Sequence, residues 1–271
     1  MIGFNQHMLV ETLRVSGPIE LEGEAHPVDA NNVVTFMRAE KTPTAEDLAS
    51  PEWNNKVFIN KIITALIKKI LSGDVPLEQL SVLFVKSLNE HHLMVQLDNP
   101  TLTDFLARRG WDGALRPAGG DFLMVVDSNI GFNKTNAVIE SSLSYDVDLT
   151  ELASPTGSLV VFHKNNAVGI DSCHHWEKVR APGEEDYPIQ DCYWDYLRFY
   201  TLPGTDLLGA SVQTVPAEWM ILGRAVPPQV DILEEEMDGV RGFGTMKVVP
   251  AGESLSTSFR FVLPPGVLEA Q

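Results

Sequence analysis

The segment "SSLSYDVDL", residues 141–149, alternates apolar and polar side chains without interruption. Leu143, Tyr145, Val147 and Leu149 would point to one side, and the Ser and Asp residues between them to the other. A period of two residues is typical of a β-strand with one buried face. Because antiparallel sheets commonly keep one face in water, the segment predicts a strand of an antiparallel sheet.

Similar short segments, separated by Pro and Gly, continue to the C-terminus. In "SLSTSFRFVLPP", residues 254–265, the expected inward positions are Leu255, Thr257, Phe259, Phe261 and Leu263. Further strands are expected within residues 122–129, 158–164, 193–203, 218–226 and 241–252. Short strands at this spacing predict an antiparallel β-sandwich.

The first half of the chain has the period of helices instead. In residues 53–74, an apolar stripe repeats every three or four positions and Gly73 ends it; its members are Ile59, Ile62, Ile63, Leu66, Ile67 and Ile70. Helices are also expected within residues 5–18, 76–91 and 99–111. The sequence therefore predicts an α+β chain, with an N-terminal α/β lobe in residues 1–125 and a β-sandwich in residues 126–271.

The charge of the chain excludes some partners. With 20 Lys and Arg against 37 Asp and Glu, the net charge is −17. Such a surface repels nucleic-acid phosphates and anionic membranes. No apolar run is long enough to cross a bilayer, and no signal peptide is visible. We therefore expect no nucleic-acid partner, and a membrane association only through an anchor outside this sequence.

The two cysteines of the chain, Cys173 and Cys192, bracket a polar segment rich in Pro and Gly. A disulfide that closes a loop of this size contributes roughly 3 kcal/mol. With His174 and His175, the thiols could instead hold Zn²⁺, but the spacing differs from that of zinc sites and adjacent His side chains point apart. We favour the disulfide, which places the protein in an oxidising, extracytoplasmic compartment.

Residues 127–136, "DSNIGFNKTN", form a polar segment between two expected strands. Asp127, Asn129 and Asn133 have the spacing that begins an oxygen-ligand Ca²⁺ loop. However, Phe132 and Val138 stand where an EF-hand needs Gly and an acidic residue.

A structured turn is the favoured interpretation of the same segment. The Asn side chains, Asn136 included, would bond backbone N–H groups, and Gly131 would supply a positive φ. In this interpretation Lys134 pairs with Asp127.

The strand "YWDYLRFYT" carries Trp194, Tyr196 and Arg198 on one face. An aromatic face with an Arg can contact an anionic or sugar ligand. More often such a face is the joint between two sheets or domains, and we favour that interpretation.

The chain lacks the sequence motifs of common catalytic sites. It contains no G-x-S-x-G, Walker, G-x-G-x-x-G or H-E-x-x-H pattern, and the acidic run at residues 234–238 is typical of a solvated loop. We therefore predict no catalytic residues, no metal and no cofactor.

Three stretches resemble the bacterial domain-of-unknown-function 4012 family. They are "DFLMVVDSNIGFNKTNAVIESSLSYDVDL" at 121–149, "CYWDYLRFYTLPGTDLL" at 192–208, and "MKVVPAGESLSTSFRFVLP" at 246–264. Members of that family are typically envelope proteins with an N-terminal transmembrane anchor and the rest outside the cell. The resemblance begins in the middle of the family, so it implies that the anchor and the first part of the α/β domain lie outside this sequence.

The α/β part of that family is in turn distantly similar to the LytR–CpsA–Psr transferases, which attach glycopolymers to cell walls from a polyprenyl-phosphate donor. Arg38 and the run Asn54–Lys56 are the only candidate remnants of such a site here. We expect a non-catalytic envelope module that binds a glycopolymer or a protein. The alternatives are a fragment of a glycopolymer phosphotransferase and a Ca²⁺-dependent surface adhesion module.

Overall fold

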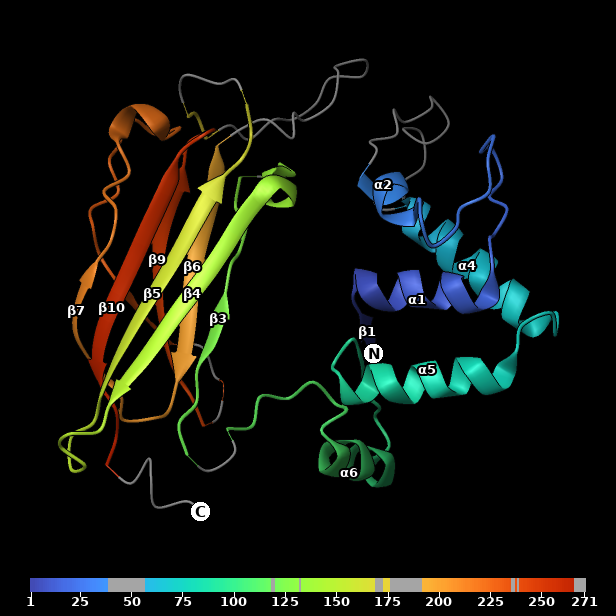
Figure 1. Cartoon of the computed structure of the whole chain (residues 1–271), viewed down its shortest axis with the longest axis horizontal. Helices are drawn as coiled ribbons and strands as arrows, with labels where there is room; N and C mark the ends of the chain where they lie inside the picture. The colour runs from blue at the N-terminus through green and yellow to red at the C-terminus, as the bar shows by residue number, and fades with distance from the viewer. Residues whose placement is uncertain are drawn as a thin grey trace. The chain divides into compact units, whose positions relative to one another are not determined.

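The computed structural model describes residues 1–38, 57–117, 120–131, 133–168, 173–175, 192–234, 237 and 239–265. The chain divides into two compact units, Met1–Ala114 and Leu115–Gln271 (Figure 1). The boundary predicted from the sequence lay later, after residue 125. The difference arises because strand β3 (Met124–Val126) pairs with β6 (Tyr193–Thr201). The residues that lead into β3 therefore belong to the second unit.

The first unit is mostly helical, with one small sheet in which β1 (Ile2–Phe4) pairs antiparallel with β2 (Leu93–Val95). Its helices are α1 (Gln6–Ser16), α2 (Val33–Arg38), α4 (Val57–Leu71), α5 (Leu77–Asn89) and α6 (Pro100–Arg109). The side chain of Asn5 caps α1 and that of Asn99 caps α6, which Gly110 ends in the left-handed conformation. Among the described residues, no helix combines the length and the apolar character needed to cross a bilayer.

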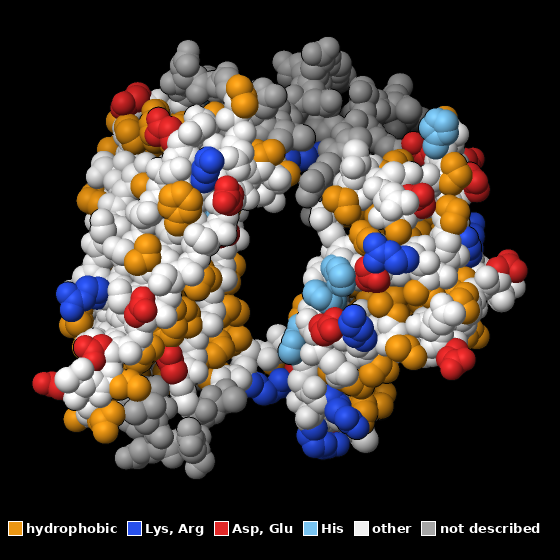
Figure 2. All heavy atoms as spheres, viewed as in Figure 1, with side chains coloured by type: hydrophobic (Ala, Val, Ile, Leu, Met, Phe, Trp, Pro, Cys, Tyr) orange, Lys and Arg blue, Asp and Glu red, His pale blue; other side chains and the backbone are white. Residues whose placement is uncertain are grey.

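The core of this unit lies between α1, α2, α4 and the segment that follows α1. Leu13, Val28, Val33 and Ile62 are its most deeply buried side chains. Other large apolar side chains of the unit lie at the surface (Figure 2), among them Leu71, Leu77, Val82, Leu102 and Phe105.

The second unit consists of two four-stranded antiparallel sheets. One sheet has the order β4 (Ile139–Asp148), β5 (Thr156–Asn165), β10 (Ser254–Val262), β7 (Asp206–Ser211). The other has the order β3, β6, β9 (Arg241–Val249), β8 (Asp231–Leu233). The α+β character and the antiparallel sheets expected from the sequence are confirmed.

Both sheets contribute to one aromatic core, made of Leu159, Val161, Leu197, Phe199, Phe243, Phe259, Phe261 and Leu263. The ring of Phe199 lies 4.7 Å from that of Phe259 and 5.5 Å from that of Phe261, measured between centroids. Because β6 carries Phe199 and β10 carries the other two, these contacts join the sheets. The predicted inward positions of residues 254–265 are buried except for Leu255, which is half-buried.

Two expectations for individual segments need correction. Residues 218–226 do not form a strand: they hold the end of a 3₁₀ turn, η2 (Ala217–Trp219), a tight turn at Gly223 and a single bridge at Val226. Prolines at 216, 227 and 228 flank this segment and cannot donate to a ladder. Along β4, Tyr145 and Val147 pack on the core, but Leu143, which was expected on the same face, is exposed.

A substitution in β5 tests how closely the strands β5 and β10 pack. A Cβ added at Gly157 would lie 2.2 Å from the Phe261 ring, which is held in the aromatic core. Gly157→Ala should therefore lower the free energy of unfolding by about 1–3 kcal/mol, as overpacking does. Gly209→Ala in β7 is the matched control, since nothing lies within 4 Å of its added methyl group. Urea unfolding measures both variants, and equal stabilities would contradict the packing described.

Candidate functional site

Beyond the aromatic core, the space between the two sheets becomes polar and charged. His163 of β5 lies on the same inward face of the strand as Leu159 and Val161. Asp195 of β6 and Lys247 of β9 occupy the corresponding rows of the other sheet. All three side chains are at most 1% exposed. Charged groups this deep must be paired, because an isolated buried charge costs several kcal/mol.

Four side chains form a continuous string of polar contacts. Lys247 Nζ lies 3.4 Å from Asp195 Oδ2 and 2.5 Å from His163 Nδ1. On the other side of the imidazole ring, His163 Nε2 lies 3.0 Å from Asp127 Oδ2. Asp127 follows β3 and its side chain is 32% exposed, so the string runs from solvent to the interior.

The partners determine how the hydrogens are arranged on this string. A charged Lys247 has only donors, so its ammonium group donates to His163 Nδ1. His163 then carries its hydrogen on Nε2 and donates it to the carboxylate of Asp127. Deep in the site, the backbone N–H of Ser128 donates to Asp195 Oδ1 at 2.7 Å. Asp195 therefore faces an ammonium group with one oxygen and an amide hydrogen with the other.

Burial shifts the ionisation of the pair toward its neutral form. It raises the pKa of Asp195 to about 7, with the positive charge of Lys247 opposing the rise and the negative charge of Asp127 adding to it. Burial likewise lowers the pKa of Lys247, against the attraction of Asp195 and Asp127. At Asp127 burial would raise the pKa, but the hydrogen bond and charge of His163, with the charge of Lys247, lower it. Burial and nearby carboxylates also raise the pKa of Tyr193, whose ring lies 5.9 Å from that of His163.

Asp127, His163 and Asp195 also form the kind of cluster that can ligate a metal ion, with ligand atoms within 4.8 Å of one another. The ammonium group of Lys247 already lies against two of these three residues. An ion could therefore bind there only after displacing Lys247. Because the ammonium group of Lys247 supplies the positive charge, the site is better described as a buried network of salt bridges and hydrogen bonds.

The polar turn predicted after β3 is present, and its Asn side chains bond mainly to the backbone. Asn129 Oδ1 accepts from the N–H of Gly131, and Asn133 Oδ1 accepts from that of Thr135. The amide group of Asn133 donates to the carbonyl of Cys192, which ties the turn to β6. Because these amide oxygens accept hydrogen bonds from backbone N–H groups, the structure supports the turn interpretation of this segment over the Ca²⁺ loop.

The role of Asn136 differs from the predicted one, since the hydrogen bond it accepts comes from a side chain. Asn136 accepts a 3.3 Å hydrogen bond from Asn129 Nδ2, and the carbonyl of Lys134 accepts from the N–H of Ala137 in the 3₁₀ turn η1 (Thr135–Val138). The Asp127 carboxylate accepts a hydrogen bond from His163, and its predicted pairing with Lys134 stays a prediction.

The prediction of a positive φ at Gly131 was wrong. A Cβ there would lie 3.0 Å from the side chain of Trp194, so close packing requires the glycine.

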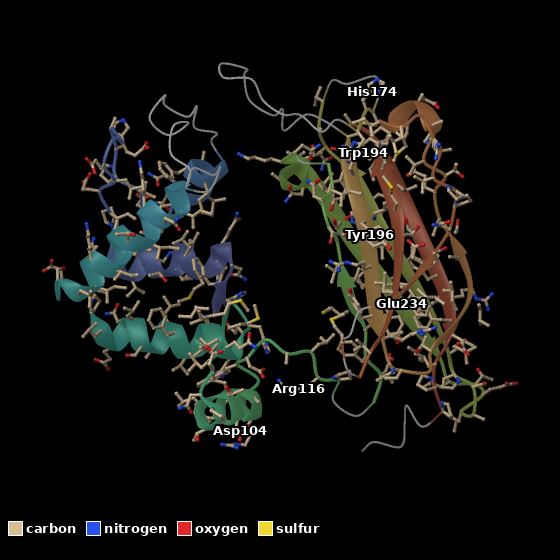
Figure 3. All side chains as sticks on the ribbon, turned by 180° about the vertical axis from the view of Figure 1, so that it is seen from behind. Asp104, Arg116, His174, Trp194, Tyr196 and Glu234 are labelled. Carbon is tan, nitrogen blue, oxygen red and sulfur yellow. A yellow bond between two sulfur atoms is a disulfide. The ribbon has the colours of Figure 1, made fainter. Side chains whose placement is uncertain are left out.

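The predicted aromatic residues of β6 follow one another along the strand (Figure 3), but each has a structural partner. The prediction that their face joins the two sheets was wrong, because the opposite face, with Leu197 and Phe199, packs between the sheets. Trp194 is 1% exposed and packs against the two cysteines, so it offers no open platform for a ligand. Tyr196 covers Gly244 and donates to Asp231 Oδ2 at 2.8 Å. Arg198 donates to Ser128 Oγ and to the hydroxyl of Tyr200.

Cys173 and Cys192 form the predicted disulfide. Both are buried with Trp194, Val215 and Val248 in a small core of their own. The neighbouring His175 bonds the carbonyl of Ile130 through Nε2. The thiols that a zinc site would need are therefore spent in the disulfide.

The other predicted contact residues lie in or near the helical unit. Arg38 ends α2, but its side chain and the whole run Asn54–Lys56 lie outside the described residues. An apolar cavity of about 160 Å³ lies close to α2 and is lined by Phe4, Asn5, Gln6, Leu9, Met37, Ile59, Ile62 and Ile63.

The sequence reasoning missed His163, Asp195 and Lys247, although a signal for each was available. Each residue occupies an inward position of a strand that also buries apolar residues in the same row, such as Val161, Leu197 or Phe243. A charged residue in a buried row needs a buried partner. Three such residues on three strands would have indicated a shared site.

Comparison with known proteins found no matching family model, no matching curated protein and no matching solved structure. A function for the chain is therefore inferred from the residues and geometry of its own two units.

Removing Lys247 should make the stability of the second unit depend strongly on pH. In Lys247→Met, Asp195 stays buried without the charge that opposes its pKa rise. A carboxyl with a raised pKa stabilises the fold below its unfolded-state pKa, about 3.9, and that stability is lost as the pH rises through the folded value. The pKa of Asp195 is about 7 with Lys247 present and should lie higher without it. The variant should therefore lose at least about 4 kcal/mol between pH 4 and pH 8, from three or more pKa units at 1.36 kcal/mol each, and more than the unmodified chain loses.

Urea unfolding at several pH values measures this loss. The double variant Asp195→Asn/Lys247→Met is the control, because it has no buried acid and should lose much less. A flat profile for Lys247→Met would show that Asp195 is not buried as described.

Proposed function

We propose that the chain is an extracytoplasmic cell-envelope protein that acts as a non-catalytic module for binding or assembly. The disulfide between Cys173 and Cys192 is the observation that carries this proposal. Disulfides persist in oxidising compartments and are rare where thioredoxin and glutathione keep thiols reduced. The bond is also built into the structure, since both cysteines lie in a core with Trp194.

The architecture supports the same interpretation. We interpret the two sheets of the second unit, with their shared core, as a β-sandwich domain. The first unit is interpreted as part of an α/β lobe similar to that of the LytR–CpsA–Psr proteins. This arrangement agrees with the resemblance to the domain-of-unknown-function 4012 family, whose members stand outside the cell on a membrane anchor.

The role of a binding or assembly module follows from how the polar residues are used. Trp194, Tyr196, Arg198 and the turn at Asn129 and Asn133 hold the second unit together through contacts within it. A partner would then be an envelope glycopolymer or a protein that contacts the acidic surface of the chain. Its net charge of −17 favours a partner with basic groups.

The state of the two cysteines in the producing cells tests the compartment. Cells lysed directly into a thiol-blocking reagent should yield protein with neither cysteine blocked, as measured by mass spectrometry of the peptides. Blocking only after reduction should modify both Cys173 and Cys192. Protein with both thiols free at lysis would contradict an extracytoplasmic location.

A fragment of an envelope glycopolymer phosphotransferase is the second candidate function. The apolar cavity beside α2 favours it, because that enzyme class must hold a prenyl tail. Its volume is a limit, however: an apolar cavity of about 150 Å³ holds benzene, so this cavity of about 160 Å³ would hold about one isoprene unit. The cavity alone is too small for a long tail, and the non-catalytic module is therefore preferred.

Geranyl phosphate is a suitable probe for this second function. If the cavity binds a prenyl group, the probe should raise the melting temperature of the chain. Ile63→Phe, which fills the cavity, should abolish the rise, and Leu71→Phe at an exposed position of the same helix should preserve it. An unchanged melting temperature of the unmodified chain would count against the phosphotransferase.

A Ca²⁺-dependent adhesion module is the least favoured role. It would need the oxygens of Asn129 and Asn133, which accept hydrogen bonds from backbone N–H groups.

A further inference from the structure

We propose that Lys247 and Asp195 join covalently, in a reaction of the folded chain with itself, to form an amide bond between strands β6 and β9. The two residues are directly opposite each other in the register of these strands, and both side chains point between the sheets. Lys247 Nζ lies 3.4 Å from Asp195 Oδ2. The carbon that the amine would attack, Cγ, is bonded to this oxygen, so the fold holds the two reacting groups side by side. The bond goes beyond the proposed function and does not depend on it.

The groups around the pair have the positions that such a reaction needs. A lysine amine is a nucleophile only in its neutral form, which the pair reaches when the ammonium proton passes to the carboxylate of Asp195. As the amine attacks and gains positive charge, His163 Nδ1, 2.5 Å from Nζ, is placed to accept the proton that the nitrogen loses. Asp127 holds the opposite nitrogen of the ring and stabilises the imidazolium that forms. Nucleophile, base and orienting carboxylate thus follow the logic of a catalytic triad, with an amine in the place of a hydroxyl.

The electrophile is also prepared. The N–H of Ser128 points at Asp195 Oδ1 from 2.7 Å, where negative charge develops when an amine attacks the carboxyl carbon. Burial favours the neutral acid over the carboxylate, as the raised pKa of Asp195 shows. A neutral carboxylic acid accepts an amine far more readily than a carboxylate does, because the negative charge of the carboxylate repels the attacking lone pair.

The reaction balances without any further reagent. The lone pair of Lys247 Nζ forms a bond to Cγ of Asp195, and His163 takes the proton that nitrogen loses. The C–O bond to Oδ2 breaks, and this oxygen leaves as water with the proton of the acid and the one returned by His163. Amine and carboxylic acid thus become an amide and one water molecule, with no change of oxidation state.

The product amide would find its hydrogen-bond partners already in place. Its oxygen, the former Asp195 Oδ1, keeps the N–H of Ser128. Its N–H is left beside His163 Nδ1, which accepts it. The bond also replaces two buried ionisable groups by a neutral one, which removes the cost of keeping charges in the interior. The same interior that is expensive for the ion pair therefore suits the amide.

Intact-mass spectrometry of the purified, folded chain tests the proposal directly. The chain should weigh one water molecule less than its sequence with the disulfide formed. After reduction and trypsin digestion, peptide 181–198 should be joined to peptide 242–260, in which cleavage after Lys247 is blocked. A folded chain with the full mass and separate peptides would overturn the proposal and leave a buried ion pair only.

Variants distinguish this linkage from other losses of water. Lys247→Met and Asp195→Ala should each keep the full mass of their sequences, and Lys164→Met, at the exposed neighbour of His163, should still lose one water. Asp195→Asn should lose ammonia instead and give the same linked peptides as the unmodified chain. Loss of water that persists in Lys247→Met would also overturn the proposal.

The roles of the other two residues show in the rate. After refolding from denaturant, samples taken over time should show the linked mass appearing at least tenfold more slowly in His163→Gln and Asp127→Asn than in the unmodified chain. Circular dichroism confirms that each variant has refolded. Equal rates in correctly folded variants would exclude His163 as the base and with it the mechanism proposed.

Discussion

The ammonium group of Lys247 imposes the strictest constraint on the second unit. It lies between two sheets, at 1% exposure, where an unpaired charge would cost several kcal/mol, a large part of the stability of a typical domain. Its partners come from three different places: Asp195 from the adjacent strand, His163 from the opposite sheet, and Asp127, through His163, from the loop after β3. The sheets must therefore meet in one register, because a slip of one residue would turn these side chains toward solvent.

The aromatic core and the charged string divide the space between the sheets. Phe199, Phe243, Phe259 and Phe261 are the largest side chains of the apolar core, whose burial drives the packing of the sheets. The string contributes little net stability, since the cost of desolvating its charges offsets their attraction. What it contributes is specificity, because only one alignment satisfies every partner. Asn165, which is fully buried two residues after His163 on β5, donates a hydrogen bond to the carbonyl of Val249 on β9 and so adds another polar contact between the sheets.

The disulfide and the charged string lie on either side of β6 and have compatible chemical requirements. Trp194 and Cys192 face the small outer core, whereas Asp195 faces the interior. A covalent Lys247–Asp195 bond would add a second cross-link to the same strand, and it is one that no reducing agent breaks. Proteins outside the cell face proteases and have no chaperones driven by ATP, so cross-links that hold a strand in place are useful there. The proposed compartment and the proposed bond thus fit each other, although each has its own evidence.

The alternation of residues such as Phe259, Arg260 and Phe261 was sufficient to predict strands and antiparallel sheets, because which face of a strand is buried is a local property of the pattern. The helices capped by Asn5 and Asn99 and the disulfide were predictable for the same reason: caps, periods and loop closure involve neighbours in sequence. The charged site was not predicted. His163, Asp195 and Lys247 are separated by dozens of residues, and only the pairing order of the strands brings them within hydrogen-bond distance. For strands such as Ser254–Val262 the sequence alone determined which side chains turn inward, and the tertiary structure decided which of them meet, because contact between distant strands depends on topology and register rather than on local pattern.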